Sequence, residues 1–167
     1  VSQEIPPYGS DTTWSSMYRA YDALSDGLKQ TLAGLKLFHS LGNPGRFEAR
    51  YKGMKARTDA KPQEFAHPVV RTHPETGRKC LFINNDFVTR FEGMTVEESE
   101  PLLNYLRRHC LRQEFTCRFR WTAGTLVIWD NRCTQHEAIS DYFPDRPEVF
   151  NARRVMHRVT IAGDRPV

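Results

Sequence analysis

The side chains best suited to chemistry lie toward the C-terminal end of the sequence. His136 follows the apolar run Leu126–Trp129 and stands in a polar stretch, and an imidazole placed just after a strand can bind a metal ion. A histidine in such a place is also a common surface or hydrogen-bonded residue. A metal site would therefore need further ligands from other parts of the chain.

Two arginines in the last apolar segment form a second candidate site. The alternation of side chains along a strand puts Arg154 and Arg158 of "RRVMHRVTI" on one face, about 13 Å apart. If that face lines a cavity, the two cations need anionic partners, and their planar forks suit carboxylate, phosphate or sulfonate oxygens. If instead Val155, Val159 and Ile161 make the core, both arginines face water. The pattern alone allows either arrangement.

The elements that would position these residues follow from the hydrophobic pattern. Apolar residues at helical spacing predict a helix over residues 14–24, capped from residues 11–13, and Ser25 can begin a second helix. Thr95 and Glu98 have the spacing of a capping box and predict a third. Early helices and late hairpin strands indicate an α+β fold built on an antiparallel sheet. Strands are predicted at residues 69–72, 80–84, 115–121, 126–129 and 153–163.

Length and composition predict one soluble globular domain. The chain has 167 residues, of which 39% are hydrophobic and 26% charged, and it contains no apolar run long enough to cross a membrane. Its four cysteines lack the spacing of a zinc site, and no secretory signal is recognisable. We therefore expect a cytoplasmic protein with reduced thiols.

Positive charge is concentrated in one segment. Residues 46–61 contain six basic and two acidic side chains, a surplus of four that equals the net charge of the whole chain, +4. Nucleic-acid binding usually shows a broader basic stripe with interleaved aromatic residues, so a nucleic-acid partner is not favoured. Because "GNPG" at residues 42–45 precedes this cluster, residues 36–62 are predicted to form a mobile loop or lid.

The order of four motifs resembles that of the TauD/TfdA family of Fe(II)- and 2-oxoglutarate-dependent dioxygenases. The motifs run from residue 9 to residue 166 and are "GSDTTW", "HPVVRTHPETGRKCLFIN", "FRWTAGTLVIWDNRCTQH" and "RRVMHRVTIAGDRP". The resemblance implies a double-stranded β-helix, or jelly roll, with flanking helices. It also implies that residues 1–167 are the C-terminal portion of a single dioxygenase domain.

The resemblance further implies roles for five residues. His136 matches the distal histidine of a 2-His-1-carboxylate iron site, and Arg154 and Thr12 match the pair that holds the far carboxylate of 2-oxoglutarate. Arg158 matches the arginine that meets the anionic head of the substrate, and Phe87 matches an aromatic wall of the substrate pocket. Thr12 could equally cap a helix, and Phe87 could belong to the core. The implied cofactor is Fe(II), with 2-oxoglutarate and O2 as cosubstrates.

The sequence departs from the family pattern at the iron site. The other two ligands form an H-x-D pair upstream of a "GGDT" motif, whereas the ten residues before Asp11 contain no histidine. We expect the sequence to begin just after that pair. The H-x-E match at His73–Glu75 lies in "THPETG" and is predicted to be a hairpin turn. In the "GSDT" motif, Ser10 replaces the usual second glycine.

A family member with all its ligands would hydroxylate a small anionic substrate and release succinate and CO2. Taurine or another alkylsulfonate is the expected substrate, and we expect a homo-oligomer with no membrane partner. One alternative is a non-catalytic member that lacks the iron-ligand pair but keeps an anion pocket. Another is a nucleic-acid demethylase-like enzyme that grips phosphates with residues 46–61, which would bind DNA or RNA with a steep dependence on salt.

Overall fold

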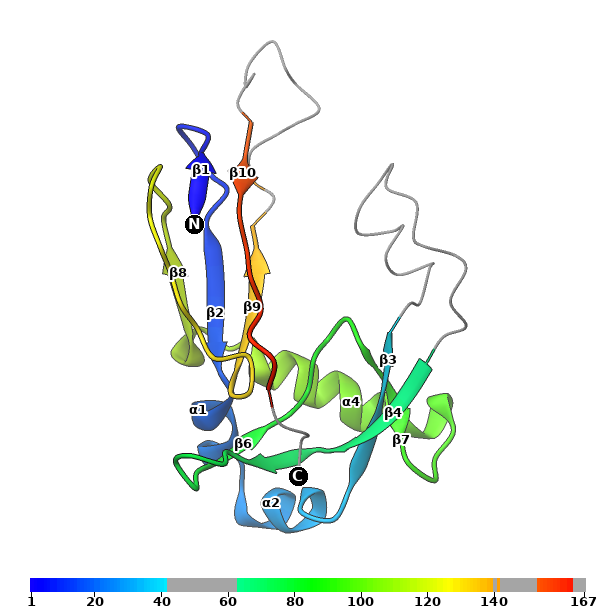
Figure 1. Cartoon of the computed structure of the whole chain (residues 1–167). Helices are drawn as coiled ribbons and strands as arrows, with labels where there is room; N and C mark the ends of the chain where they lie inside the picture. The colour runs from blue at the N-terminus through cyan, green and yellow to red at the C-terminus, as the bar shows by residue number, and fades with distance from the viewer. Residues whose placement is uncertain (42–62, 140, 142–152, 164–167) are drawn as a thin grey trace.

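A computed structural model of the chain, which describes residues 1–41, 63–139, 141 and 153–163, combines helices with antiparallel strands (Figure 1). In chain order the elements are β1 (Ser2–Glu4), β2 (Thr12–Ser16), α1 (Met17–Asp22), α2 (Asp26–Leu32), β3 (Lys36–Leu41), β4 (Gln63–Pro68), β5 (Val70–Thr72), β6 (Lys79–Leu81), β7 (Val88–Phe91), α4 (Val96–Cys110), the 3-10 turn η1 (Gln113–Phe115), β8 (Thr116–Phe119), β9 (Thr134–Ala138) and β10 (Val155–Met156). Figure 1 shows β1, β2, β8, β9 and β10 side by side at one end of the molecule, with the helices and the other strands at the opposite end.

Every strand pairing in the described residues is antiparallel. The sheet orders are β8-β2-β9 and β4-β3-β7, with two-stranded ladders β5-β6 and β1-β10. The ladder of β1 with β10 joins the two ends of the described chain. The predicted mixture of helices with antiparallel sheets is confirmed. Within the described residues, no helix has both the length and the apolar character that crossing a membrane requires.

Two helices begin where local capping chemistry predicted them. The Ser25 hydroxyl accepts the Leu28 backbone N–H at the start of α2. At the start of α4, Thr95 accepts the N–H of Glu98, and the Glu98 carboxylate accepts the N–H of Thr95, so both halves of the capping box are present. These bonds satisfy N–H groups that a helix cannot pair internally. Both predictions are confirmed.

The first predicted helix, over residues 14–24, is correct only in its second part. Thr12–Ser16 is the central strand β2, and only Met17–Asp22 is helical, with Ser16 as the cap. The backbone of β2 pairs on both sides, with β8 and with β9. Because threonine and tryptophan also suit a pleated surface, this pairing outweighs the helical spacing of the apolar residues. The reading of Thr12 as a helix cap is therefore wrong.

The predicted loop or lid at residues 36–62 is also corrected in part. Residues Lys36–Leu41 form β3, the centre of a three-stranded sheet in which Leu37 is fully buried. The backbone N–H and C=O groups of β3 are paired by β4 and β7 on its two sides. Residues 42–62, including the basic cluster at 46–61, lie outside the described residues.

Two predicted strands are not formed as expected. Residues 126–129 have no strand pairing among the described residues. The backbone of Ser2 bonds to Gly124 and Thr125, just before this segment. Leu126 and Ile128 are 64% and 84% exposed. The last predicted strand, 153–163, is reduced to β10, which pairs with β1 at Ser2 and Glu4. Alternating apolar residues form a strand only where a neighbour pairs with the backbone.

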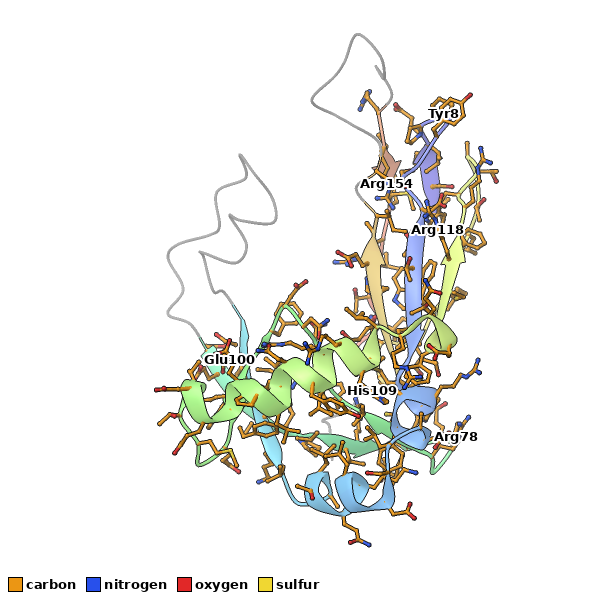
Figure 2. The ribbon with its side chains drawn as sticks, turned by 180° about the vertical axis from the view of Figure 1, so that it is seen from behind. Tyr8, Arg78, Glu100, His109, Arg118 and Arg154 are labelled. Atoms are coloured by element: carbon orange, nitrogen blue, oxygen red, sulfur yellow. The ribbon has the colours of Figure 1, made fainter. Side chains whose placement is uncertain are left out.

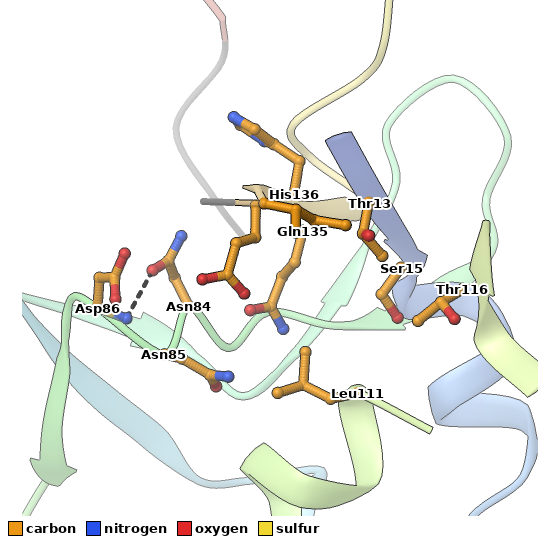
Figure 3. Close-up of a pocket in the computed structure, with 11 residues that line it drawn as sticks. Thr13, Ser15, Asn84, Asn85, Asp86, Leu111, Thr116, Gln135 and His136 are labelled. Atoms are coloured by element: carbon orange, nitrogen blue, oxygen red, sulfur yellow. Dashed lines mark hydrogen bonds between the residues drawn. The ribbon is translucent and has the colours of Figure 1, made fainter. Parts of the chain in front are cut away.

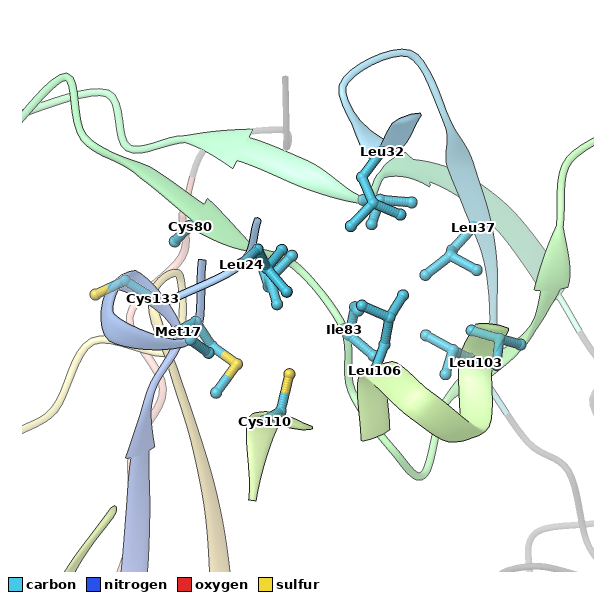
Figure 4. Close-up of a cluster of buried hydrophobic side chains, with 14 of the residues drawn as sticks. Met17, Leu24, Leu32, Leu37, Cys80, Ile83, Leu103, Leu106, Cys110 and Cys133 are labelled. Atoms are coloured by element: carbon cyan, nitrogen blue, oxygen red, sulfur yellow. The ribbon is translucent and has the colours of Figure 1, made fainter. Parts of the chain in front are cut away.

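The main hydrophobic core lies between the helices and the strands β3, β6 and β7 (Figure 4). Its fully buried members include Leu32, Leu37, Phe91, Leu103 and Leu106. Helix α4 buries one face against this cluster, while its charged residues remain outside. The core thereby fixes α1, and the strand β2 that leads into it.

Candidate functional site

The register of β2 determines which candidate residues stand together. Thr12 lies opposite Ala138 of β9, and Trp14 lies opposite His136. Directly opposed residues share a face, and so do residues two apart along one strand. Thr12, Trp14 and His136 therefore stand on one face of the sheet, and their neighbours Thr13 and Gln135 stand on the other.

His136 lies beside a group of tryptophans. Its exposed ring is centred 5.0 Å from the ring of Trp129, which is itself 5.3 Å from Trp14. Trp121 joins the group at 6.2 Å from Trp14. The imidazole thus stands at the border of an apolar aromatic wall. Such a wall can restrict the access of water to a group bound at the imidazole.

Thr12 offers a buried hydroxyl on the same face. Its side chain is 4% exposed, and Oγ1 accepts a hydrogen bond from Nε1 of Trp121 at 2.9 Å. A hydroxyl that accepts from an indole keeps its own proton to donate. That donor suits an anionic oxygen.

Arg154 lies next to the turn that leads into β2. Its half-buried side chain donates from Nε to the carbonyl oxygen of Ser10 at 3.3 Å. The pairing of β1 with β10 brings this residue from the far end of the sequence to a point two residues before Thr12. Figure 2 shows Arg154 and Arg118 at the same end of the upright group of strands.

A network of charges holds this turn in shape. Arg118 of β8 donates to Asp11 at 2.6 Å and to Asp141 at 2.8 Å. The Asp141 carboxylate also accepts the backbone N–H of Ser10 at 2.7 Å. Gly9 has φ +68° and lies so close to Asp141 that a Cβ at residue 9 would meet its carboxylate oxygen at 2.5 Å. Glycine is therefore required there.

The two residues predicted to contact substrate are less tightly placed. Arg158 lies beyond the end of β10 with an exposed side chain, so no ladder defines which face it shares with Arg154. Phe87 precedes β7 and is 41% exposed, and its carbonyl oxygen accepts the N–H of Ser40 at 2.8 Å. Its exposure does not fit a core residue. The roles of both residues stay predictions.

A cavity of about 360 Å³, lined by both polar and apolar side chains, lies beside β9, and the sequence did not predict it (Figure 3). Figure 3 shows Gln135 directed toward Asn84 and Asn85, whereas the ring of His136 leaves the strand on the opposite side. His136 is itself one of the lining residues of this cavity, but its ring is directed away from Asn84 and Asn85. Phe87 does not line it, although Asn84, Asn85 and Asp86 of the same "FINNDF" segment do.

Another group of polar residues surrounds the turn before β9. Asp130 accepts hydrogen bonds from Arg132 and from His73, and Arg132 also pairs with Glu75. The Arg132 guanidinium, and secondarily His73, hold the pKa of the Asp130 carboxyl well below its usual range. The prediction that "THPETG" forms a hairpin turn is confirmed, since it joins β5 to β6.

The described residues fit part of the iron and keto-acid site that the sequence predicts. The hydroxyl of Thr12 and the guanidinium of Arg154 are donors suited to a carboxylate. Of the three ligands of a facial triad they would supply one, His136. The group of three side chains among the described residues that lie close enough together to hold a metal ion is His73, Asp130 and Cys133, and it does not include His136. A complete triad requires two further ligands.

Comparison with known proteins places these residues in context. The family model described as "Taurine catabolism dioxygenase TauD, TfdA family" matches residues 1–160. The chain is 39% identical to the alpha-ketoglutarate-dependent dioxygenase cnsM of Penicillium expansum over 98% of its own length and 45% of that protein. It is 37% identical to an alkylsulfatase of Acinetobacter baylyi, covering 96% of this chain and 50% of that protein.

Two further matches each cover more than half of the other protein. A 2,4-dichlorophenoxyacetate dioxygenase of Cupriavidus pinatubonensis, also named alpha-ketoglutarate-dependent, is 38% identical over 96% of this chain and 53% of its own length. The crystal structure of AAD-2 in complex with Mn(II) and N-oxalylglycine superposes with a TM-score of 0.82 at 31% identity, covering 99% of this chain and 62% of that one. The chain thus spans about half the length of the curated relatives it matches.

Proposed function

Because the chain belongs to the taurine catabolism dioxygenase TauD, TfdA family, we propose that the complete protein is a dioxygenase dependent on Fe(II) and 2-oxoglutarate. The observation that carries the proposal is the common sheet face of Thr12 and His136, with Arg154 bonded to the turn just before it. A potential metal ligand and two groups that can donate hydrogen bonds to a carboxylate thereby lie close together, although they come from three separate parts of the sequence.

Each residue has a definite part in the proposal. His136 would be one ligand of a 2-His-1-carboxylate iron site, and the other two would come from outside the described residues. Thr12 would donate its hydroxyl proton to the far carboxylate of 2-oxoglutarate, and Arg154 would form a forked ion pair with the same carboxylate. Arg158 would bind the anionic head of the substrate, with Phe87 as an aromatic wall.

Bound Fe(II) would supply the site at which O2 is activated while 2-oxoglutarate loses CO2. One oxygen atom of O2 ends in the new carboxylate of succinate and the other ends in the hydroxyl group of the product, so the atoms balance. Trp14, Trp121 and Trp129 would limit the access of water to this face. The chain's contribution is therefore to orient the keto acid and the substrate in a water-poor site.

The proposed substrate is a small organic anion, with an alkylsulfonate such as taurine ahead of a sulfate ester or an aryloxyacetate. The family description refers to taurine, and the relatives are named for alkyl sulfates and for dichlorophenoxyacetate. All three head groups match the planar fork of Arg158. Succinate release measured with one member of each class would distinguish them.

The proposed setting follows from the same family membership. The sheet β8-β2-β9 and the ladder β1-β10 would be parts of the two facing sheets of a jelly roll in a single domain. We propose a cytoplasmic homo-oligomer.

The test uses two adjacent arginines in the complete protein. Arg154→Gln removes the proposed carboxylate clamp, and a lost bond to a charged group costs about 1.5–3 kcal/mol, so KM for 2-oxoglutarate should rise by about 10- to 150-fold. Arg153→Gln is the matched control. Arg153 is 76% exposed at its side chain and pairs with Glu4 at 3.5 Å, so its loss should change KM by less than about twofold.

The readout is succinate formed from 2-oxoglutarate in the presence of O2 and the responsive substrate. Equal values of KM for the two variants would contradict the role of Arg154. The absence of succinate in the folded parent protein with every substrate class would contradict the enzyme itself. That second result would favour a family member that binds anions without catalysis.

A further inference from the structure

Two motifs that are 57 residues apart meet at the start of β9. His73, in the turn between β5 and β6, is 3% exposed, and its Nε2 lies 3.1 Å from Oδ2 of Asp130. A second link joins Nη1 of Arg132 to Oε1 of Glu75 at 3.0 Å. The hairpin is thus tied directly to the turn from which the strand of His136 begins.

The hydrogen bonds of the His73 ring fix the position of its proton. The backbone N–H groups of Glu75 and Thr76 both point at Nδ1, each at 3.3 Å. A backbone N–H can only donate, so Nδ1 is the unprotonated nitrogen and Nε2 carries the hydrogen. A neutral His73 therefore donates from Nε2 to the Asp130 carboxylate.

The same pattern decides against a cation in this cluster. The ligand atoms of His73, Asp130 and Cys133 lie within 4.8 Å of one another, a spacing that a metal ion could use. A metal on Nε2 would need the lone pair that the proton occupies, and Oδ2 of Asp130 already accepts from Arg132 at 2.7 Å. The cluster is better explained as a brace made of hydrogen bonds.

Asp130 shapes the turn that starts β9. Its Oδ1 accepts the backbone N–H of Arg132 at 2.8 Å, and its carbonyl oxygen accepts the hydroxyl of Thr134 at 2.6 Å. Thr134 is the first residue of β9, and the register that follows from it puts His136 opposite Trp14. The orientation of Asp130 therefore bears on where the imidazole stands.

We propose that His73 is a positioning residue for His136. Its Nε2–H holds Asp130, Asp130 holds the turn, and the turn sets the place at which β9 presents the imidazole. The inference rests on the proposed iron function. Removing the donor leaves the half-buried Asp130 carboxylate with one partner fewer, so the turn relaxes and the iron ligand is less well placed.

The test compares two buried histidines in the complete protein. His73→Phe removes the Nε2 donor and keeps an aromatic ring. His109→Phe is the matched control, because His109 is 5% exposed and its Nε2 donates to the carbonyl oxygen of Ala20 at 2.7 Å, far from β9 in the sequence. Fe(II) is titrated without oxygen in saturating 2-oxoglutarate, with the visible band of the chelate as the signal. Thermal unfolding of each apoprotein reports the structural cost.

We expect H73F to weaken Fe(II) binding about tenfold, as the loss of a residue that supports a metal ligand commonly does. H109F should lower the melting temperature by a similar amount and leave the Fe(II) affinity unchanged. If H73F does not fold, His73→Gln and His73→Asn replace it. The amide nitrogen of glutamine reaches about as far as Nε2, whereas that of asparagine stops near Nδ1, so only the glutamine variant should keep the parent affinity.

The outcomes separate the two claims. Equal Fe(II) affinities of H73F and H109F, or of the glutamine and asparagine variants, would overturn the positioning role while the parent still binds iron. A folded parent protein that shows no chelate band would overturn the iron function, and with it this inference.

Discussion

Ser10 occupies a backbone conformation that suits glycine. Its φ is +60°, its side chain is fully buried, and within the described residues its Oγ has no hydrogen-bond partner. A left-handed conformation costs a residue with a Cβ about 1 kcal/mol, and a buried hydroxyl without a partner adds to that cost. The usual glycine of the resembled motif has neither cost.

Ser10→Gly should therefore raise the free energy of unfolding by about 1 kcal/mol, measured by urea denaturation. Ser10→Ala keeps the backbone strain and removes only the hydroxyl, so its gain should be smaller. A glycine variant less stable than the parent would show that the turn is not strained.

His39 links stability to pH. It is 9% exposed and stacks on Phe82 with ring centres 5.3 Å apart, while His67 lies 5.0 Å away. Burial, and to a lesser extent the charge of His67, lower the pKa of His39 from 6.5 to about 4. The unfolded chain binds a proton at a pH where the folded chain does not. The stability contributed by neutral His39 is complete above about pH 6.5 and is lost as the pH falls toward 4.

Parent protein should accordingly lose about 2–3 kcal/mol more than His39→Gln when the pH is lowered from about 7 to about 4.5. Urea denaturation of both proteins at the two pH values gives this difference directly. Parallel losses in the two proteins would mean that His39 titrates normally in the folded state.

Among the elements, α4 depends on its capping box. Thr95→Ala removes the hydroxyl that accepts the Glu98 N–H at 3.2 Å, and the loss of such a cap costs about 1 kcal/mol. Thr95→Ser keeps the hydroxyl and should stay within a few tenths of the parent. Chemical denaturation of the three proteins tests this, and identical midpoints for the alanine and serine variants would exclude a stabilising cap.

The elements that could be predicted from the sequence are those whose ends are marked by local capping or turn residues. Ser25 begins α2, the capping box begins α4, and "PETG" joins β5 to β6. By contrast, β2 could not be told from a helix, because its state is decided by pairing with residues 116–119 and 134–138. Residues 126–129 alternate like a strand but lack a paired neighbour among the described residues.

The candidate site was predictable one residue at a time, but its arrangement was not. His136, Thr12 and Arg154 stand out by motif, yet the common face of Thr12 and His136 follows from a register between two distant strands. No local pattern contains that register. The bridge from His73 to Asp130 was missed for the same reason, since each half reads as a separate turn.

At the scale of the whole molecule, the fold brings the far ends of the described chain together. Strand β10 pairs with β1, and Arg154 reaches the turn before β2. Joining distant segments in this way suits the proposed site, which would bind a metal, a keto acid and a substrate together. The chain spans about half the length of its curated relatives.

The central claim is that His136 binds iron beside a bound keto acid, and an anaerobic titration of the complete protein with Fe(II) and 2-oxoglutarate tests it most directly. We predict a weak visible charge-transfer band in the parent and no band in His136→Ala. The control is His157→Ala, which changes an exposed histidine just after β10 and should keep the band. A band of full strength in His136→Ala, or none in the folded parent, would contradict the account.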